Sequence, residues 1–286
     1  MEGRPPWWRA GRGTGLTGVK AGCQVPDFDV SVPSPARMWN YWIGGKDHFQ
    51  ADREAAEKVI EVMPFMPLIA QAARRFLGGA VTLLATDYSV RQFLDIGTGL
   101  PVADNTHEVA QRTAPDSRIV YVDNDPIVLT HARALLTSGS GGRTDYIHAD
   151  LRDTDKILAG AGRTLDLSRP VAVLLIEILH FIPDTDDPYG VIGRLMDGLP
   201  SGSYLVIAHA PSDIEVETTA AMTERYNQNS PVPITMRTRE QVTRFFDGLE
   251  LVEPGVVMAG QWPASSEAGV DMAGRVAGWC GVGLKR

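Results

Sequence analysis

A short glycine turn is the first feature of the sequence with chemical meaning. Residues 93–101 read FLDIGTGLP, so Gly97 and Gly99 directly follow an apolar run that contains Asp95. Glycines at such a place let the backbone approach a ligand without interference from a Cβ atom, and they can leave amide N–H groups facing it. Asp95 could orient the turn or face a ligand cation. Alone, a G-x-G spacing is weak evidence, because a tight strand-to-helix turn without a ligand has the same pattern.

Acidic side chains end the next two apolar runs. Asp123 ends VYVD, where a carboxylate can accept hydrogen bonds from the 2′- and 3′-hydroxyls of a ribose. Asp150 ends IHAD, one run further, where it could accept from an exocyclic amine such as N6 of adenine; capping the following helix is the alternative. Asp125, which precedes Pro126, is typical of a helix N-cap.

A glutamate and two histidines stand at or just beyond the ends of the fourth and fifth runs. VLLIEILHFIPD brings Glu177 and His180 toward the same edge, and YLVIAHA brings His209. Either histidine could take a proton from a hydroxyl or ammonium group near neutral pH, with a structural role as the alternative. Acids at three successive strand ends, after one glycine turn, fit an adenosine-containing ligand better than a set of unrelated helix caps.

A nicotinamide dinucleotide fits this turn less well. The fingerprint of dinucleotide-binding folds requires a third small residue, G-x-G-x-x-G/A, and that place is Val102, after Pro101. Without the third glycine the turn is less suited to seating a pyrophosphate on a helix N-terminus. The sequence therefore favours a ligand with adenosine but no diphosphate and keeps an NAD-dependent oxidoreductase as a weaker alternative.

Short apolar runs alternate with segments of helical length from residue 91 onward. The runs are RQFLDI, SRIVYVD, TDYIHAD, VAVLLIEI and SYLVIAHA. Their alternation predicts a doubly wound α/β fold with a mostly parallel sheet covered on both faces. Ligands of such sheets lie beyond the carboxyl ends of the strands, where the glycine turn and the acids are found. Residues 31–88 contain two helical patterns, from near Ala51 or Asp52 and from about Pro67 to Asp87, and predict an N-terminal helical cap.

Composition indicates a soluble globular protein. Of 286 residues, 44% are hydrophobic and 22% charged, and the longest apolar segment, residues 171–182, contains Glu177 and His180, so no membrane span is expected. The net charge of −8 disfavours nucleic acid as a partner. Two cysteines without ligand spacing predict a reducing, cytoplasmic setting and no structural zinc. The glycine-rich, basic residues 1–30 predict a flexible tail.

A metal ion is not expected either. Asp184, Asp186 and Asp187 form an acidic loop that could hold a divalent cation, but oxygen ligands must converge from several elements, and loop acids of this kind are usually solvated.

With these residues in place, the sequence resembles a class I S-adenosylmethionine-dependent methyltransferase. LDIGTG is similar to the first motif of that class, VDNDP to the second, HADL to the third and LLIEILHFIPD to the fourth. NYWIGGKDHFQADR, together with VDNDPIVLTHARALL, resembles more narrowly the S-adenosyl methyltransferase family DUF574, over about residues 30–286. The resemblance implies a Rossmann-like domain over residues 89–286, with seven strands in the order 3-2-1-4-5-7-6 and strand 7 antiparallel. LELVEPGVV would be strand 6 and WCGVGLKR strand 7.

The same resemblance implies S-adenosylmethionine as cofactor and S-adenosylhomocysteine as product. The positions that would contact the cofactor, from methionine through ribose to adenine, are Gly97 and Gly99, then Asp123, then Asn124, Asp150 and Leu151. Glu177 would face the amino-acid part of the cofactor or the substrate.

The aromatic segment before the sheet is expected to fold back across the cofactor. Tyr41, Trp39 or Trp42 could stabilise a sulfonium through a ring face, and plain packing of a cap helix is the alternative. Residues 211–236 are expected to close an acceptor pocket, so Tyr226 joins Trp42 as a candidate substrate contact, with Asn227 and Asn229 nearby.

The function expected from all this is methyl transfer to a small-molecule acceptor by in-line displacement, in which positioning and exclusion of water supply much of the acceleration. A non-catalytic sensor or partner protein that binds the cofactor is the alternative from another class, and aminopropyl transfer is a weaker one. The pattern leaves open whether oxygen, nitrogen or carbon is methylated, and whether the protein is a monomer or a homodimer.

Overall fold

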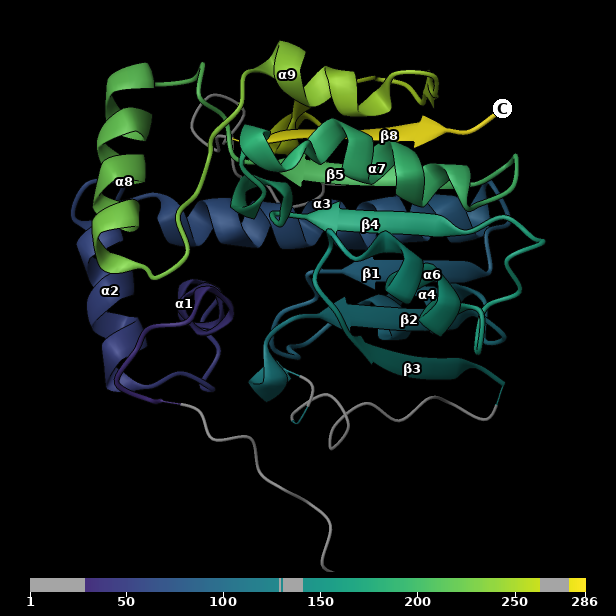
Figure 1. The fold of residues 1–286 in the computed structure, drawn as a ribbon, viewed down its shortest axis with the longest axis horizontal. Helices are drawn as coiled ribbons and strands as arrows, with labels where there is room; N and C mark the ends of the chain where they lie inside the picture. The colour runs from purple at the N-terminus through teal and green to yellow at the C-terminus, as the bar shows by residue number, and fades with distance from the viewer. Residues whose placement is uncertain (1–28, 129, 131–140, 263–277) are drawn as a thin grey trace, which may run out of the picture.

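A mixed β-sheet forms the centre of the protein (Figure 1). The computed structural model describes residues 29–128, 130, 141–262 and 278–286. The predicted tail therefore lies outside the described residues, except for its last two positions. The strands are β1 (Gln92–Ile96), β2 (Arg118–Asp123), β3 (Arg143–His148), β4 (Ala172–Ile176), β5 (Tyr204–His209), β6 (Glu250–Leu251), β7 (Val257–Met258) and β8 (Trp279–Leu284).

The order of the strands is β3-β2-β1-β4-β5-β8-β6, and β7 pairs with β8 beside this path. The first five strands are parallel, and β8 is antiparallel to β5. This confirms the predicted topology, with the last strand inserted between the fifth and the sixth. The predicted strand LELVEPGVV is instead two short strands, β6 and β7, because the chain turns at Gly255, where φ is +82°. The sheet consequently has eight strands rather than seven.

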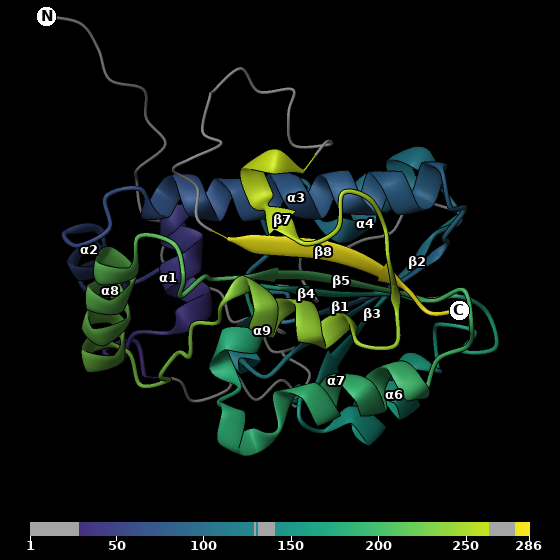
Figure 2. The ribbon, with the colours of Figure 1, turned by 90° about the horizontal axis from the view of Figure 1, so that it is seen from above.

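Helices cover both faces of the sheet and one of its ends (Figures 1 and 2). On one face lie α3 (Met66–Thr86) and α4 (Thr106–Thr113); on the other lie α6 (Thr154–Ala161), α7 (Pro188–Asp197) and α9 (Arg239–Thr243). At the end toward which the parallel strands point stand α1 (Pro35–Trp42), α2 (Gln50–Ile60) and α8 (Val216–Asn229). Short 3-10 turns are η1 (Leu179–Phe181), η2 (Asp184–Asp186), η3 (Arg244–Phe246) and η4 (Ala259–Gln261).

The core has two halves, one on each face of the sheet. Phe93 belongs to the cluster under α3, and its neighbour Leu94 belongs to the cluster under α7, because successive side chains of a strand point to opposite faces. β1, β4 and β5 are buried almost throughout, which explains their continuous apolar character.

The fourth strand ends earlier than its sequence pattern suggested. The fourth apolar run continues to Ile178, but β4 ends at Ile176 because Glu177 has φ +56°, which is incompatible with a strand. Further along the chain, α9 is followed directly by the tighter turn η3.

α3 is long and apolar enough, by length and composition, to cross a membrane; among the helices described, no other passes this test. An 18-residue stretch of α3 has a mean hydropathy of 1.2, and 56% of that stretch is buried inside the protein. A core helix of a soluble protein has the same composition, and α3 packs on the sheet through side chains such as Phe76 and Leu84. The apolar character of α3 is thus explained by its place in the core.

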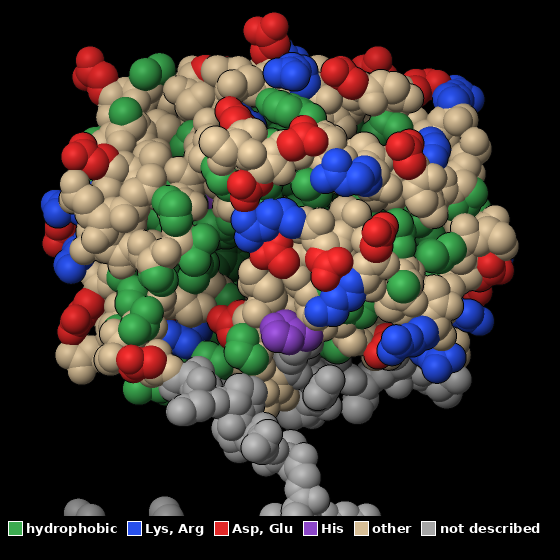
Figure 3. Space-filling model, in the orientation of Figure 1, with side chains coloured by type: hydrophobic (Ala, Val, Ile, Leu, Met, Phe, Trp, Pro, Cys, Tyr) green, Lys and Arg blue, Asp and Glu red, His purple; other side chains and the backbone are tan. Residues whose placement is uncertain are grey.

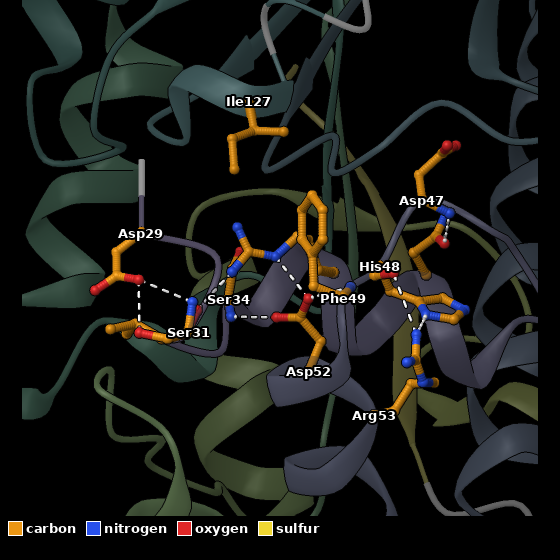
Figure 4. A network of polar contacts seen from close by, with 12 residues as sticks. Asp29, Ser31, Ser34, Asp47, His48, Phe49, Asp52, Arg53 and Ile127 are labelled. Carbon is orange, nitrogen blue, oxygen red and sulfur yellow. Dashed lines mark hydrogen bonds and ion pairs between the residues drawn. The ribbon is translucent and has the colours of Figure 1, made fainter. Parts of the chain in front are cut away.

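A buried ion pair fastens the N-terminal helices to each other (Figure 4). The carboxylate of Asp52, on α2, accepts from Nε of Arg37 at 2.7 Å and from the backbone N–H groups of Ser34 and Phe49 at 2.9 and 2.7 Å. Asp52 and Arg37 are both almost fully buried. The hydroxyl of Ser34 in turn donates to Asp125, just beyond β2. This network holds the start of α1 against the carboxyl end of the sheet.

Candidate functional site

A cavity of about 450 Å³ opens at the carboxyl ends of the parallel strands, and its size is typical of a small-molecule site. Its wall comes mainly from three parts of the chain: the ends of β1, β2, β3 and β4, the helices α1 and α3, and the segment from Ala210 to Met236. The space-filling view shows a hollow on this face, with hydrophobic side chains gathered along one side and charged side chains along the other (Figure 3).

The glycine turn after β1 lies in the wall of the cavity. Gly97 and Gly99 have φ values of +75° and +64°. A Cβ on Gly97 would also come within 2.6 Å of the side chain of Ile178, so only glycine fits there. Asp95 accepts a hydrogen bond from the hydroxyl of Thr106 at 2.6 Å, and burial raises the pKa of its carboxyl. Asp95 therefore links the turn to α4 at the floor of the cavity.

Asp123, at the end of β2, is fixed by the backbone on both of its oxygens. Oδ2 accepts from the N–H of Gly99 at 2.9 Å, and Oδ1 accepts from the N–H of Asp125 at 2.9 Å. Burial raises the pKa of Asp123 to about 6. Each carboxylate oxygen has a second lone pair, so this residue, which lines the cavity, can still accept hydrogen bonds from two hydroxyls.

Asp150 lies one strand further and is held by Arg152. Nε and Nη2 of Arg152 donate to its two oxygens at 2.7 and 2.8 Å, and Nδ2 of Asn124 donates at 3.2 Å. The hydrogen bonds from Arg152 lower the pKa of Asp150 to about 2. Asp150 does not cap α6, whose N-cap position is Asp153. Asn124, Asp150, Leu151 and Arg152 all line the cavity at the end near β2 and β3.

Glu177 and His180 meet in the wall of the cavity, beyond β4. Nδ1 of His180 lies 3.5 Å from Oε2 of Glu177, and their side chains are only 10% and 7% exposed. The positive φ of Glu177 is a sparsely populated conformation for a residue with a side chain, and such strain is often found at functional sites. In the part of the chain described, Nδ1 of His180 is buried without a hydrogen-bond partner. The pair is therefore available to a ligand.

His209 is not placed to act as a base on a ligand in this cavity. It is fully buried inside the fold, outside the cavity wall that the described residues form. Its Nδ1 contacts the carbonyl of Ala210 at 2.7 Å, and its Nε2 accepts from Nη1 of Arg237 at 3.0 Å. Burial and the nearby charges of His180 and Arg237 hold the pKa of His209 well below its usual range. Both ring nitrogens are thus occupied, and His209 is a structural residue.

The aromatic residues of the cap divide into two groups. Trp39 and Trp42 line the cavity and contact each other edge to face, with ring centroids 6.1 Å apart. Tyr41 lies outside this wall, because its hydroxyl donates to Glu57 and its ring packs against His48. The structure therefore does not place Tyr41 where it could contact a sulfonium.

The segment after β5 forms the opposite wall, where Tyr226 lines the cavity. Burial raises the pKa of the Tyr226 hydroxyl to about 12. Asn227 and Asn229 do not line it: Asn227 bonds to the backbone of Ile234, and Asn229 accepts from Lys58 on α2 at 2.9 Å. The last contact joins α8 to α2 of the cap outside the cavity wall.

Two arginines of the cavity wall were not predicted from the sequence. Arg152 directly follows the HADL motif, so the reasoning that placed Asp150 at a strand end could have found it. Arg74 lies within the apolar pattern of α3, which gives no signal of its role. Its Nη2 donates to the carbonyls of Ala103 and Asp104 at 3.2 and 2.8 Å, and burial lowers its pKa. Arg74 places a positive charge near the glycine turn.

The carboxylates of the acidic loop, residues 184–187, form hydrogen bonds with other groups of this chain. Asp184 accepts from Arg237 and Asp186 from Arg152, and Asp187 caps α7 through the N–H of Gly190. Across the described ranges, no group of three or more histidine, cysteine, aspartate or glutamate side chains converges as metal ligands would.

The fold and the site define a class: a Rossmann-like α/β protein with methyltransferase topology and a cavity for an adenosine-containing ligand. The sequence profile of the S-adenosyl methyltransferase family matches residues 22–286. A DUF574 family protein from Streptomyces avermitilis is 41% identical, with a TM-score of 0.85 over 90% of this chain and 99% of that one. A protein from Thermobifida fusca that bears a provisional methyltransferase name is 38% identical, with a TM-score of 0.82 over 90% and 97% of the two chains.

More distant structures share only the fold. Magnesium protoporphyrin IX methyltransferase from Synechocystis, solved with S-adenosylmethionine, is 12% identical with a TM-score of 0.50 over 92% of this chain and all of that one. No functionally curated protein is significantly similar in sequence.

The chain belongs to the S-adenosyl methyltransferase family, DUF574. Its cofactor is S-adenosylmethionine, as the resemblance implied. The cavity fits this group, because it combines a carboxylate with free lone pairs at Asp123, an open glycine turn and a cation at Arg74.

Proposed function

We propose that the protein is an enzyme that transfers the methyl group of S-adenosylmethionine to a small molecule held in the same cavity. One observation carries this proposal: a single cavity connects the acid-bearing edge of the sheet with an apolar space enclosed by α1 and α8. A sensor would need only the first part. A transferase needs both, because the acceptor must lie beside the cofactor.

In this proposal the sheet edge holds the cofactor. Asp123 accepts from the ribose hydroxyls; Asn124 and Leu151 border the adenine, while Asp150, held by Arg152, shapes that end. At the other end, Arg74 attracts the carboxylate of the methionine part, which passes over the glycine turn. The cofactor, when bound, supplies an electrophilic methyl group on a positively charged sulfur.

The cap and α8 exclude water from the apolar space. Trp39 and Trp42 supply one wall and Tyr226 the other. The two walls are joined outside the cavity by the hydrogen bond from Lys58 to Asn229 and by the ion pair of Arg225 with Glu61 at 3.8 Å. Methyl transfer to a nucleophile benefits from such enclosure, because positioned reactants and a dry site lower the barrier without a protein nucleophile.

The proposal is tested by two measurements on the purified protein. Calorimetric titration with S-adenosylmethionine, S-adenosylhomocysteine and NAD is expected to show binding of the first two alone. Incubation with a fraction of cellular small molecules and S-adenosylmethionine labelled in its methyl group is expected to give a labelled product that mass spectrometry detects. Binding without any labelled product would favour the sensor, and binding of NAD alone would favour an oxidoreductase.

A further inference from the structure

The apolar part of the cavity has a distinctive composition. We call it the acceptor chamber and define it by six side chains: Trp39, Trp42, Met66, Met222, Tyr226 and Ile234. Aromatic rings and methionines present polarisable surfaces to a ligand and attract cations through the ring faces. None of the six carries a charge.

Neither arginine of the cavity wall is among the six side chains of the acceptor chamber. Arg152 is paired with Asp150 and with Asp186, and Arg74 donates to the backbone beyond the glycine turn. Among the described residues of the wall, no lysine or arginine stands in the acceptor chamber. An acceptor with a carboxylate or phosphate would therefore enter the chamber without a counter-charge, which is strongly unfavourable in an apolar space.

Glu177 is the carboxylate that the segment after β4 contributes to the cavity wall. Its side chain is 7% exposed, and among the described residues His180 is the basic side chain within ion-pair distance of its carboxylate. His180 lies beside it, with Nδ1 3.5 Å from Oε2 of the carboxylate. A buried carboxylate of this kind requires a cation or hydrogen-bond donors for its stability. Glu177 holds this position with a backbone φ of +56°, a conformation that is energetically unfavourable for a residue with a side chain.

We propose that the acceptor is an apolar amine, so that the enzyme is an N-methyltransferase whose Glu177 receives the basic nitrogen. This inference rests on the proposed function, because it concerns the second half of the same cavity. The apolar body of the acceptor fills the chamber against the rings of Trp39 and Tyr226. Its nitrogen lies at the sheet edge, where Glu177 and His180 face it.

The proton and electron balance of this reaction is simple. The acceptor arrives as an ammonium ion and gives one proton to the Glu177–His180 pair, which frees the lone pair of its nitrogen. That lone pair forms the new N–C bond as the S–C bond breaks, and the electron pair of the broken bond stays on sulfur to give S-adenosylhomocysteine. The methylated nitrogen bears the positive charge that the sulfur loses, and the proton held by the pair passes to water when the product leaves.

The test compares three ligands that share one body and differ in the head group: 3-phenylpropylamine, 3-phenylpropan-1-ol and 3-phenylpropanoate. Each is titrated into the protein saturated with S-adenosylhomocysteine. We expect the amine to bind at least tenfold more tightly than the alcohol, and the carboxylate to bind most weakly. In Glu177→Gln, which keeps the size of the side chain, the affinity for the amine is expected to fall at least tenfold, whereas the affinity for the alcohol changes less than threefold.

A matched variant controls for a general effect of removing a charge. Glu217 lies exposed on α8, and Glu217→Gln is expected to leave all three affinities unchanged. The proposal is overturned if the carboxylate binds as tightly as the amine, if the preference for the amine persists in Glu177→Gln, or if none of the three binds. It is overturned as well if Glu177→Gln loses affinity for S-adenosylhomocysteine itself, since Glu177 would then serve the cofactor. Failure of the wild type to bind S-adenosylhomocysteine would instead refute the proposed function.

Discussion

Lowering the pH from 7 to 5 is expected to weaken the binding of S-adenosylhomocysteine about tenfold, because Asp123 must be ionised to accept both ribose hydroxyls. Burial raises the pKa of Asp123 to about 6, against 3.8 for an exposed aspartate. At pH 7 the carboxyl group is mostly ionised, and at pH 5 it is mostly protonated. A protonated carboxyl group has lost an acceptor position, so only the ionised fraction binds the ribose fully.

The same pKa has the opposite effect on the stability of the ligand-free protein. A folded-state pKa above the unfolded value means that the contribution of Asp123 to stability is fully present below about 3.8 and is lost as the pH rises through about 6. Affinity and the stability contribution of this residue therefore change in opposite directions between pH 5 and 7. A general acid-induced loss of structure would change both in the same direction.

The assay is calorimetric titration at several pH values on the wild type and on Asp123→Asn. The variant cannot titrate at this position, so its pH profile is expected to be flat over this interval. At pH 7 its affinity is expected to be lower by 1.5–3 kcal/mol, or roughly tenfold to 150-fold, the usual contribution of hydrogen bonds to a charged group. A wild-type affinity that does not change with pH, or an equal slope in the variant, would refute the assignment of the ribose to Asp123.

Three further predictions concern the residues around the cavity. Arg37→Ala leaves the carboxylate of Asp52 buried and unpaired, so urea denaturation is expected to show a free energy of unfolding lower by about 3–5 kcal/mol, and a loss below 1 kcal/mol would contradict the role of this pair. Gly97→Ala forces a Cβ against Ile178 at a φ of +75° and is expected to lower stability by about 1–3 kcal/mol and to weaken cofactor binding; a variant unchanged in both would contradict the geometry of the turn. His209→Ala is expected to lower the free energy of unfolding by about 1–3 kcal/mol while cofactor affinity changes less than threefold, and selective loss of that affinity in a folded variant would contradict a purely structural histidine.

The fold was predictable because a parallel sheet leaves two signals in the sequence, one from its strands and one from the connections between them. Buried parallel strands require continuous apolar runs, and the crossovers between them require segments of helical length. The same periodicity identifies the strand ends, and it therefore predicts that Gly97, Asp123 and Asp150 lie at one edge of the sheet. The resemblance to the family supplied the order of the last strands, which short runs alone do not define.

The placement of the other site residues depends on tertiary structure, which the local sequence does not show. Glu177 and His209 both follow apolar runs, yet only Glu177 reaches the cavity, because it leaves β4 in a left-handed conformation while His209 stays within β5, paired to Trp279 of β8. Arg74 belongs to α3, whose packing against the sheet brings one of its two arginines to the cavity. No local pattern encodes these placements.

The central claim, that one cavity holds the cofactor at the sheet edge and the acceptor beneath the cap, is tested most directly by a crystal structure with S-adenosylhomocysteine. The account predicts the ribose at Asp123, the adenine at Asn124 and Leu151, and the homocysteine passing Gly97, with the acceptor chamber between Trp39 and Tyr226 left free beside the sulfur. A ligand whose adenosine part fills that chamber, or that lies outside the cavity, would contradict it.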